Sequence, residues 1–299
     1  MMSTVIAVFE ERRNLLFAVA YRMLGTAADA EDVVQDAWLR WSAADRSDVA
    51  EPTAYLVRIV TNLALDRLRS AQAQRESYVG PWLPEPLLTT PDAGEDVDMA
   101  ESVSMAMLVV LETLSPLERA VFVLREVFGY SNAEIAEALD RSEASVRQLA
   151  HRAREHVQAR RPRFQASREE RRLATSRFIR ATLGGDINAL MEVLAPDVTL
   201  WTDGGGKVPA PLRTITGVDK VSRWLQAAVG KPYLGVAPED MTFDTIELNR
   251  VPGIVINGPG GPISAFTVDV DDAGRVSAIH VVANPDKLRA LSTGRRLPF

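Results

Sequence analysis

The side chains best suited to hydrogen-bond nucleic acid lie on one short segment near the middle of the chain. Within residues 142–157 the apolar positions recur at helical spacing and must face a core, which leaves polar side chains on the opposite face. Arginine, glutamine, serine and histidine are the residue types that bond base edges and phosphates in a DNA major groove. The candidates for base edges are Ser145, Arg147, Gln148, His151 and Arg152, and those better placed for phosphates are Arg141 and Arg154.

A second helix must come before this one to hold it. Ser131 and Glu134 have the spacing of a capping box, which predicts a helix start. The inward stripe of that helix is expected to be Ala133, Ile135, Ala136 and Leu139. Residues 140–142 then predict a turn, and Ser142 can cap the next helix. Together these features predict a helix-turn-helix, with a helical hairpin carrying a solvated basic face as the alternative.

Length and composition limit the possible classes of protein. A chain of 299 residues is expected to form two or three domains. It has no apolar run long enough to cross a membrane and no evident signal peptide, so we expect a cytoplasmic protein. The absence of cysteine excludes disulfides and cysteine-based zinc sites, and we expect no metal and no cofactor.

The net charge of −6 hides strong local contrasts. Residues 76–118 contain nine acidic side chains and no basic one, whereas residues 141–163 contain seven arginines against two glutamates. A local basic patch can bind phosphates whatever the total charge. Because the whole chain is acidic, we expect a partner to supply much of the DNA binding.

Residues 4–42 have helical periodicity that is interrupted at Gly25. The helix that contains residues 30–41 has two stripes at helical spacing. One is apolar and belongs in a core: Val34, Ala37, Trp38 and Trp41. The other is acidic around one leucine: Asp32, Gln35, Asp36 and Leu39. An acidic stripe of this kind is either a solvated face or a docking surface for an arginine-rich partner helix.

A third helix is predicted over residues 54–70, after a loop at residues 45–53. Its apolar positions pack inward and leave a polar face outside, whose candidate residues are Tyr55, Arg58, Asn62 and Arg69. Aromatic, amide and guanidinium groups beside a loop suit unstacked bases and single-stranded phosphates. A plain surface helix with pairs four residues apart is the alternative.

The order of DAEDVVQDAWLRW, AYLVRIVTNLALDRLR and the helix-turn-helix block resembles the extracytoplasmic-function sigma factors of bacterial RNA polymerase over about residues 5–160. The resemblance implies sigma region 2 at residues 1–75 and region 4 at 108–163. It implies that the acidic stripe docks on the clamp helices of the largest polymerase subunit. It also implies that loop 45–53 and Tyr55, Arg58 and Asn62 read the −10 element, and that the helix-turn-helix reads the −35 element beside the flap of the second subunit.

Residues 76–107 form an expected acidic linker that contains the sequence WLPEP. Four prolines between residues 81 and 91 exclude a regular helix there. Trp82, Leu83, Leu87 and Leu88 are too apolar for a bland linker and are expected to pack on another part of the protein. In sigma factors the corresponding linker threads near the polymerase active channel, and the resemblance implies that role here.

Residues 164–299 predict helices followed by a curved antiparallel sheet, which resembles the SnoaL-like members of the NTF2-like fold, a cone with an internal cavity. Together with WLPEP, the motifs DGGGK (203–207) and NPDKL (284–288) resemble the sigma factor J-like group. In that group the extension modulates sigma activity in place of a separate anti-sigma factor. The implied regulatory contacts are Trp82, Leu83, Pro84, Asp203, Lys207, Asn284, Pro285, Asp286, Lys287 and Leu288.

The expected fold class is therefore multidomain, with two all-α sigma domains and an α+β NTF2-like cone. The expected function is that of an alternative sigma factor, not an enzyme, with no catalytic residue. Two alternatives remain: a one-component ligand-responsive DNA-binding regulator, and a C-terminal isomerase or cyclase in which Asp203 and His280 face one cavity. A small-molecule sensing pocket is favoured over turnover.

Overall fold

Three long helices form the N-terminal part of the computed structural model, which describes residues 2–44, 49–75, 77–89, 103–160, 166–293 and 296–297. These helices are α1 (Met2–Leu24), α2 (Ala27–Ala43) and α3 (Pro52–Arg75). The apolar stripe of α2 is inside, with Val34, Ala37 and Trp41 buried, because it packs against α1 and α3. Trp38 is only partly buried and contacts the Phe9 ring edge-on.

The second helical unit contains the predicted helix-turn-helix. Its elements are α5 (Met105–Leu111), α6 (Pro116–Phe122), the π-helical turn η1 (Val123–Val127), α7 (Asn132–Leu139) and α8 (Glu143–Arg160). The predicted capping box of Ser131 and Glu134 is present, and Ser142 accepts a bond from the Ser145 N–H. The expectation for Ala133 is wrong, because it is exposed in the first turn of α7.

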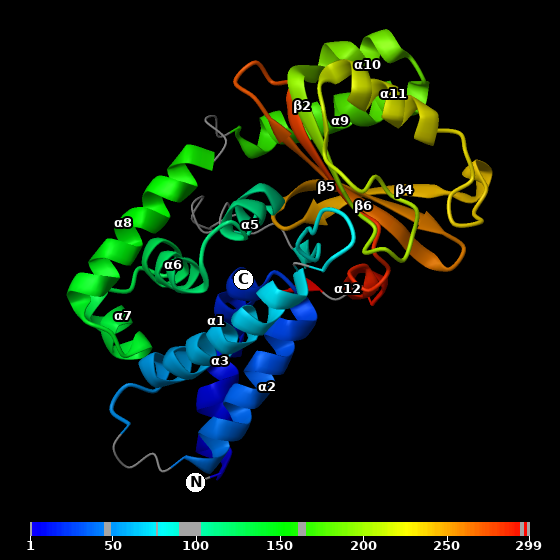
Figure 1. Ribbon diagram of the computed structural model, residues 1–299. Helices are drawn as coiled ribbons and strands as arrows, with labels where there is room; N and C mark the ends of the chain where they lie inside the picture. The colour runs from blue at the N-terminus through cyan, green and yellow to red at the C-terminus, as the bar shows by residue number, and fades with distance from the viewer. Residues whose placement is uncertain are drawn as a thin grey trace.

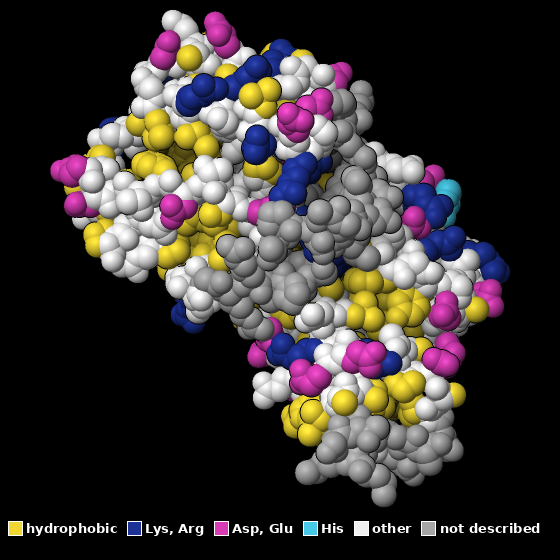
Figure 2. Space-filling model, turned by 180° about the vertical axis from the view of Figure 1, so that it is seen from behind, with side chains coloured by type: hydrophobic (Ala, Val, Ile, Leu, Met, Phe, Trp, Pro, Cys, Tyr) yellow, Lys and Arg dark blue, Asp and Glu magenta, His cyan; other side chains and the backbone are white. Residues whose placement is uncertain are grey.

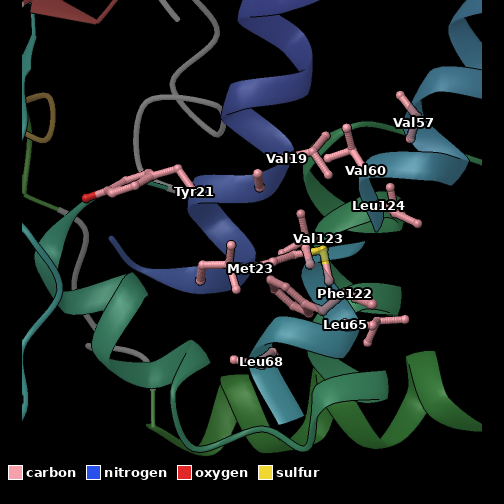
Figure 3. Close-up of a cluster of buried hydrophobic side chains, with 14 of the residues drawn as sticks. Val19, Tyr21, Met23, Val57, Val60, Leu65, Leu68, Phe122, Val123 and Leu124 are labelled. Carbon is pink, nitrogen blue, oxygen red and sulfur yellow. The ribbon is translucent and has the colours of Figure 1, made fainter. Parts of the chain in front are cut away.

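The two helical units share one hydrophobic core. Buried side chains of α1 and α3 pack against those of α6 and η1 in a single cluster. Figure 3 shows Val19 and Met23 from α1 and Val60 from α3 beside Phe122 and Val123. The helix-turn-helix is thus held against the N-terminal helices and is not a separate body.

The C-terminal part is a sheet covered by helices on one face (Figure 1). The helices on that face are α9 (Arg168–Gly184), α10 (Ile187–Val193) and α11 (Val218–Ala228), whereas α12 (Arg289–Ser292) packs with Leu83 of the linker on the opposite face; a 3₁₀ turn η2 (Pro238–Asp240) precedes β4. The main strands are β2 (Leu194–Asp203), β4 (Thr242–Leu248), β5 (Val251–Gly258), β6 (Gly261–Val270) and β7 (Val276–Val282). Short strands β3 (Ile215–Thr216), β1 (Leu88–Thr89) and β8 (Arg296–Leu297) complete the order β3-β2-β7-β6-β5-β4-β1-β8.

The sheet is mixed, which corrects the expectation of a purely antiparallel one. β2 pairs in parallel with β7, as Trp201 opposite His280 shows. Between β2 and β7 the chain passes through β3, α11, β4, β5 and β6, and it then returns beside β2 in the same direction. A tight turn joins β6 and β7, in which the Gly274 N–H donates to the Asp271 carbonyl at 3.0 Å and Gly274 has φ 73°.

The segment between the helical units and the sheet has no helix from Tyr78 to Leu87, as the prolines predict. It runs between α1–α3 and the sheet (Figure 1), and Leu88 then pairs with Leu248 as strand β1. The expected boundary between residues 107 and 108 falls inside α5, and the proposed domain limits stay a prediction. Residues 90–102, which include most of the acidic run, lie outside the described part. None of the described helices is both long and apolar enough to cross a membrane.

Candidate nucleic-acid interface and interdomain contacts

The polar face of α8 is exposed, as its sequence predicts. Val146, Leu149, Ala150, Ala153 and Val157 are buried, whereas Arg147, Gln148, His151 and Arg152 are exposed and Ser145 and Arg154 are half-buried. Helical spacing alone decides this division, because the buried stripe leaves one outer face. In Figure 2 dark-blue arginine side chains line the edge of the molecule formed by α8.

Several of these basic side chains already have acidic neighbours. Arg154 contacts Glu126 at 2.6 Å, Arg152 contacts Glu118 at 3.3 Å, and Arg147 contacts Glu143 at 3.2 Å. His151 Nε2 lies 3.5 Å from Glu155. Ion pairs between such partly or fully exposed side chains are worth about 1 kcal/mol or less, so a DNA phosphate can replace the carboxylate. The face is therefore available to DNA. Arg141 is exposed in the turn before α8.

The polar face of α3 is only partly accessible. Arg58 and Arg69 are exposed, and Tyr55 packs its ring 5.9 Å from that of Trp41. Asn62 donates from its side-chain amide to the carbonyl oxygen of Ala138 on α7, at 2.9 Å. The structure thus places α7 against one of the residues expected to contact DNA. Loop residues 45–48 lie outside the described part.

The acidic stripe of α2 faces outward. Arg67 of α3 binds both Asp29 at 2.7 Å and Asp32 at 2.6 Å, which ties one end of the stripe to the bundle. Gln35 and Asp36 are exposed, and Leu39 is 57% exposed. A large apolar side chain exposed among acidic ones is the arrangement expected of a docking surface with a basic partner.

One buried carboxylate holds the linker to the C-terminal sheet. Asp203, at the end of β2 and fully buried, accepts from the Tyr78 hydroxyl at 2.6 Å and the Leu83 N–H at 2.8 Å. The Lys287 ammonium lies 2.6 Å from the same carboxylate and also donates to the Leu83 carbonyl. Burial lowers the pKa of Lys287 to about 8, against the opposing effect of Asp203. We call Tyr78, Leu83, Asp203 and Lys287 the Asp203 node.

Trp82 lies between charges from two domains. The Lys287 ammonium is 4.0 Å from the centre of its ring, and the Arg75 guanidinium of α3 is 3.8 Å away. Its ring edge also presses on Gly25, where a Cβ atom would lie 2.7 Å from Trp82 Cη2. Gly25 has φ 76°, so both its backbone conformation and the space demand glycine. The motif WLPEP is thus a packed wedge between α1, α3 and the sheet.

A second set of linker contacts was not among the predicted residues. Asn249 accepts from the Leu87 N–H at 3.0 Å and donates to the Tyr21 hydroxyl at 2.7 Å, which in turn donates to the Glu85 carbonyl. The Glu85 carboxylate accepts from the Ala27 N–H at 2.7 Å. Thr26 makes no capping bond, so the linker supplies the N-terminal cap of α2. A carboxylate fifty-eight residues away cannot be identified as a cap from local sequence.

A further ion cluster joins the two helical units. Glu112, at the C-cap of α5, contacts both Arg75 of α3 and Arg119 of α6. The Arg119 side chain is 1% exposed, and its Nε donates to the Arg22 carbonyl at 2.9 Å. Burial lowers the pKa of Arg119, which makes a facing carboxylate necessary for the charge.

The motifs DGGGK (203–207) and NPDKL (284–288) lie in contact with each other. Lys207 pairs with Asp286, and Asn284 donates to the Tyr78 hydroxyl at 2.9 Å. Gly205, at φ 60°, lies so close to Asn284 that a side chain there would overlap it. Of the other implied residues, Pro84 and Leu288 are buried, whereas Pro285 is exposed.

Asp203 and His280 share one face of the sheet, but it is not the face that lines the cavity. Trp201 pairs with His280 and Asp203 with Val282, so all four project to the linker side. Their neighbours Thr202 and Val281 line a cavity of about 710 Å³ on the other side. His280 is buried with Nδ1 3.6 Å from Asp269, and burial lowers its pKa. The alternative that these two residues form a cavity-facing acid–base pair is therefore wrong, because strand alternation separates them from it.

Known protein families match the two helical units of the chain separately. The family model Sigma-70 region 2 matches residues 8–74, and Sigma-70, region 4 matches residues 104–157. The chain is 40% identical to the ECF RNA polymerase sigma factor SigJ of Mycobacterium tuberculosis (strain ATCC 25618 / H37Rv), with 96% of each chain covered. It is 29% identical to SigG of the same strain, over 92% of this chain and 79% of that protein. The crystal structure of M. tuberculosis SigJ is similar, with TM-score 0.76, 37% identity and coverage of 98% of this chain and 100% of that one.

Proposed function

Because this chain belongs to the extracytoplasmic-function sigma factors of RNA polymerase, we propose specific residues for its contacts with polymerase and promoter, and a regulatory role for its C-terminal domain. The protein is an alternative sigma factor: it binds core RNA polymerase and directs transcription initiation at promoter DNA. Its C-terminal domain has the NTF2-like fold. The proposed place of action is the cytoplasm, where bacterial polymerase works.

The outer stripe of α2 is the proposed surface for core polymerase. Asp32 and Asp36 supply negative charge toward the basic clamp helices of the largest subunit, Gln35 adds a neutral hydrogen-bonding group, and Leu39 is the apolar anchor. An exposed apolar side chain that becomes buried at the centre of an interface carries much of the binding energy.

Leu39→Ala is expected to weaken binding to core polymerase about tenfold, because the anchor loses most of its buried apolar area. Fluorescence anisotropy of labelled protein titrated with core enzyme measures the change. Leu173→Ala is the matched control, since Leu173 is a similarly exposed leucine (48%) on α9. Equal affinities for the two variants would exclude the α2 stripe as the docking surface.

The proposed promoter contacts use two helices. α8 reads the −35 element through Ser145, Arg147, Gln148, His151 and Arg152, with phosphates bound by Arg141 and Arg154. The face of α3 with Tyr55, Arg58, Asn62 and Arg69 contacts the −10 element. The observation that supports this assignment best is the clean separation of a buried stripe and an exposed polar face on α8.

Gln148→Ala tests this assignment in transcription with core polymerase on a matched promoter. A bidentate base contact contributes about 1–3 kcal/mol of discrimination between bases, so its loss is expected to lower initiation at the matched promoter roughly 5- to 150-fold. The preference for one base is expected to weaken at a single −35 position only. Gln158→Ala, an exposed glutamine at the far end of α8, is the control. If neither variant changes promoter use, Gln148 does not contact a base.

The C-terminal domain is proposed to hold the sigma domains in a closed arrangement. Support comes from the Asp203 node, which fixes the linker on the sheet, and from α7, which contacts Asn62 on the face proposed for the −10 element. Release of the linker would allow the two DNA-reading helices to separate to promoter spacing. Catalysis by this domain is not proposed, since the described residues lining its cavity include no aspartate, glutamate or histidine.

A further inference from the structure

The C-terminal cavity has the size and lining of a small-molecule site. Its volume of about 710 Å³ lies within the range of roughly 300–1,000 Å³ that is usual for such sites. It is bounded by α9, α11, residues 229–243 and one face of the sheet, and its walls are mainly aromatic and aliphatic, with Phe178, Trp224, Phe243 and Phe266 among them. Figure 2 shows hydrophobic side chains gathered around a hollow on this domain.

The few polar groups of the cavity are nearly all used by the protein. The hydroxyls of Thr182, Thr202 and Tyr233 donate to the carbonyls of Phe178, Pro211 and Pro209, at 2.7, 2.9 and 3.1 Å. Ser264, a residue that is 5% exposed, also lines the cavity, and its hydroxyl is accessible there. A ligand that enters the cavity can therefore hydrogen-bond this hydroxyl in place of water.

Charge further limits the ligand. The described lining contains no acidic side chain and no histidine, and its basic side chain, Lys231, is exposed and so lies at the rim. A buried charge without a partner would be strongly disfavoured in such walls. The interior therefore suits a neutral molecule with an apolar body and one hydrogen-bonding group.

We propose that this cavity binds an uncharged, largely apolar small molecule whose polar group bonds Ser264, and that its occupancy is transmitted to the Asp203 node. The transmission to the Asp203 node rests on the proposed regulatory role of the domain. The binding of the ligand does not, so it can be tested without transcription.

The cavity and the Asp203 node lie on opposite faces of the sheet, at the ends of the same two strands, β2 and β7. Thr202 lines the cavity and the next residue, Asp203, binds the linker; Ala283 lines the cavity and the next residue, Asn284, bonds Tyr78. The loop after β2 also contacts both, because Pro211 lines the cavity while Pro211 and Leu212 pack against Gly80 of the linker. Packed elements transmit small displacements because they have no free space to absorb them.

The binding test uses full-length protein and the neutral fluorescent dye Nile red, displaced by 1-decanol or by decanoate. We expect saturable dye binding, and displacement by decanol at least about tenfold more readily than by decanoate. Ile263→Trp, which fills the cavity from β6, is expected to lower dye affinity at least about tenfold, whereas Leu173→Trp on the surface of α9 leaves it unchanged. Equal loss in both variants, no saturable binding, or preference for decanoate would overturn the site.

The coupling test measures amide hydrogen exchange of residues 78–89 with and without saturating decanol. Exchange at the Leu83 N–H is expected to change at least about threefold in the parent and in Leu173→Trp, and not in Ile263→Trp. Decanol binding without a change in exchange would refute the transmission but not the site. The regulatory role itself is tested separately, by measuring promoter-dependent transcription with the Asp203→Asn variant in the absence of any ligand.

Discussion

Asp203→Asn is expected to lower the free energy of unfolding by about 3–5 kcal/mol, the range for removing one partner of a buried ion pair. The carboxylate faces three donors: the Tyr78 hydroxyl, the Leu83 N–H and the Lys287 ammonium. An asparagine at this position has one acceptor oxygen and turns an NH₂ donor toward that group of donors. Lys287, which is 7% exposed, is then a buried charge without its counter-ion. Urea denaturation followed by circular dichroism measures the change.

Two further variants separate the ion pair from general damage. Lys207→Gln breaks an exposed pair with Asp286 and is expected to change the free energy of unfolding by less than about 1 kcal/mol. The double variant Asp203→Asn/Lys287→Met removes both buried charges and is expected to recover part of the loss, because the uncompensated ammonium is gone. No recovery would mean that hydrogen bonds to Asp203, rather than its charge, stabilise the interface.

The same variant tests regulation. If the Asp203 node holds the closed arrangement, Asp203→Asn is expected to raise promoter-dependent transcription per folded molecule at limiting core polymerase, because less free energy opposes opening. Lys207→Gln is expected to match the parent more closely. Transcription by Asp203→Asn that is no higher than that of the parent, per folded molecule, would reject the proposal that this contact restrains the sigma domains.

Glu112→Gln is expected to lower the free energy of unfolding by about 2–3 kcal/mol and to loosen the two helical units from each other. Glu112 is the acidic partner of both Arg75 and Arg119, and the latter is buried. The expected loss is below the ~3–5 kcal/mol of a fully buried pair because the Glu112 side chain is 15% exposed. The apolar core that the two units share remains and limits the loosening.

The separation can be measured directly, because the chain has no cysteine of its own. Donor and acceptor dyes on Glu10→Cys of α1 and Gln158→Cys of α8 report the distance between the units. Glu112→Gln is expected to lengthen the mean distance, whereas Asp66→Asn, which removes an exposed acid paired with Arg69, is not. An unchanged distance in both would show that the Glu112 cluster does not hold the two units together.

The local patterns proved reliable where the physical cause is local. Helical spacing correctly assigned the buried and exposed sides of α8, and the Ser131–Glu134 box starts α7 as predicted. The prolines of the linker exclude helix through Leu87, as expected. Ala133 was assigned inward wrongly, since a small residue in a first turn carries little information about which side is covered.

The placement of Asp203 and His280 shows the limit of such reasoning. The sequence indicated strands, and a period of two puts Asp203 and Trp201 on one face. The sequence did not indicate which face of the sheet α9 and α11 would cover and which face the linker would cover, because that depends on how distant elements pack. The same holds for Glu85 as the cap of α2 and for Asn249 as the partner of Tyr21.

The sequence by itself therefore determined the family, the order of sigma region 2 and region 4, and the exposed polar face of α8. These follow from short-range periodicity and from motifs that lie within one element. Only the tertiary structure decided that WLPEP is wedged between α3 and the sheet, that α7 contacts Asn62, and that the cavity faces away from Asp203. Those contacts join residues up to about 200 positions apart, and they exist because burying the linker's apolar side chains requires surfaces from both ends of the chain.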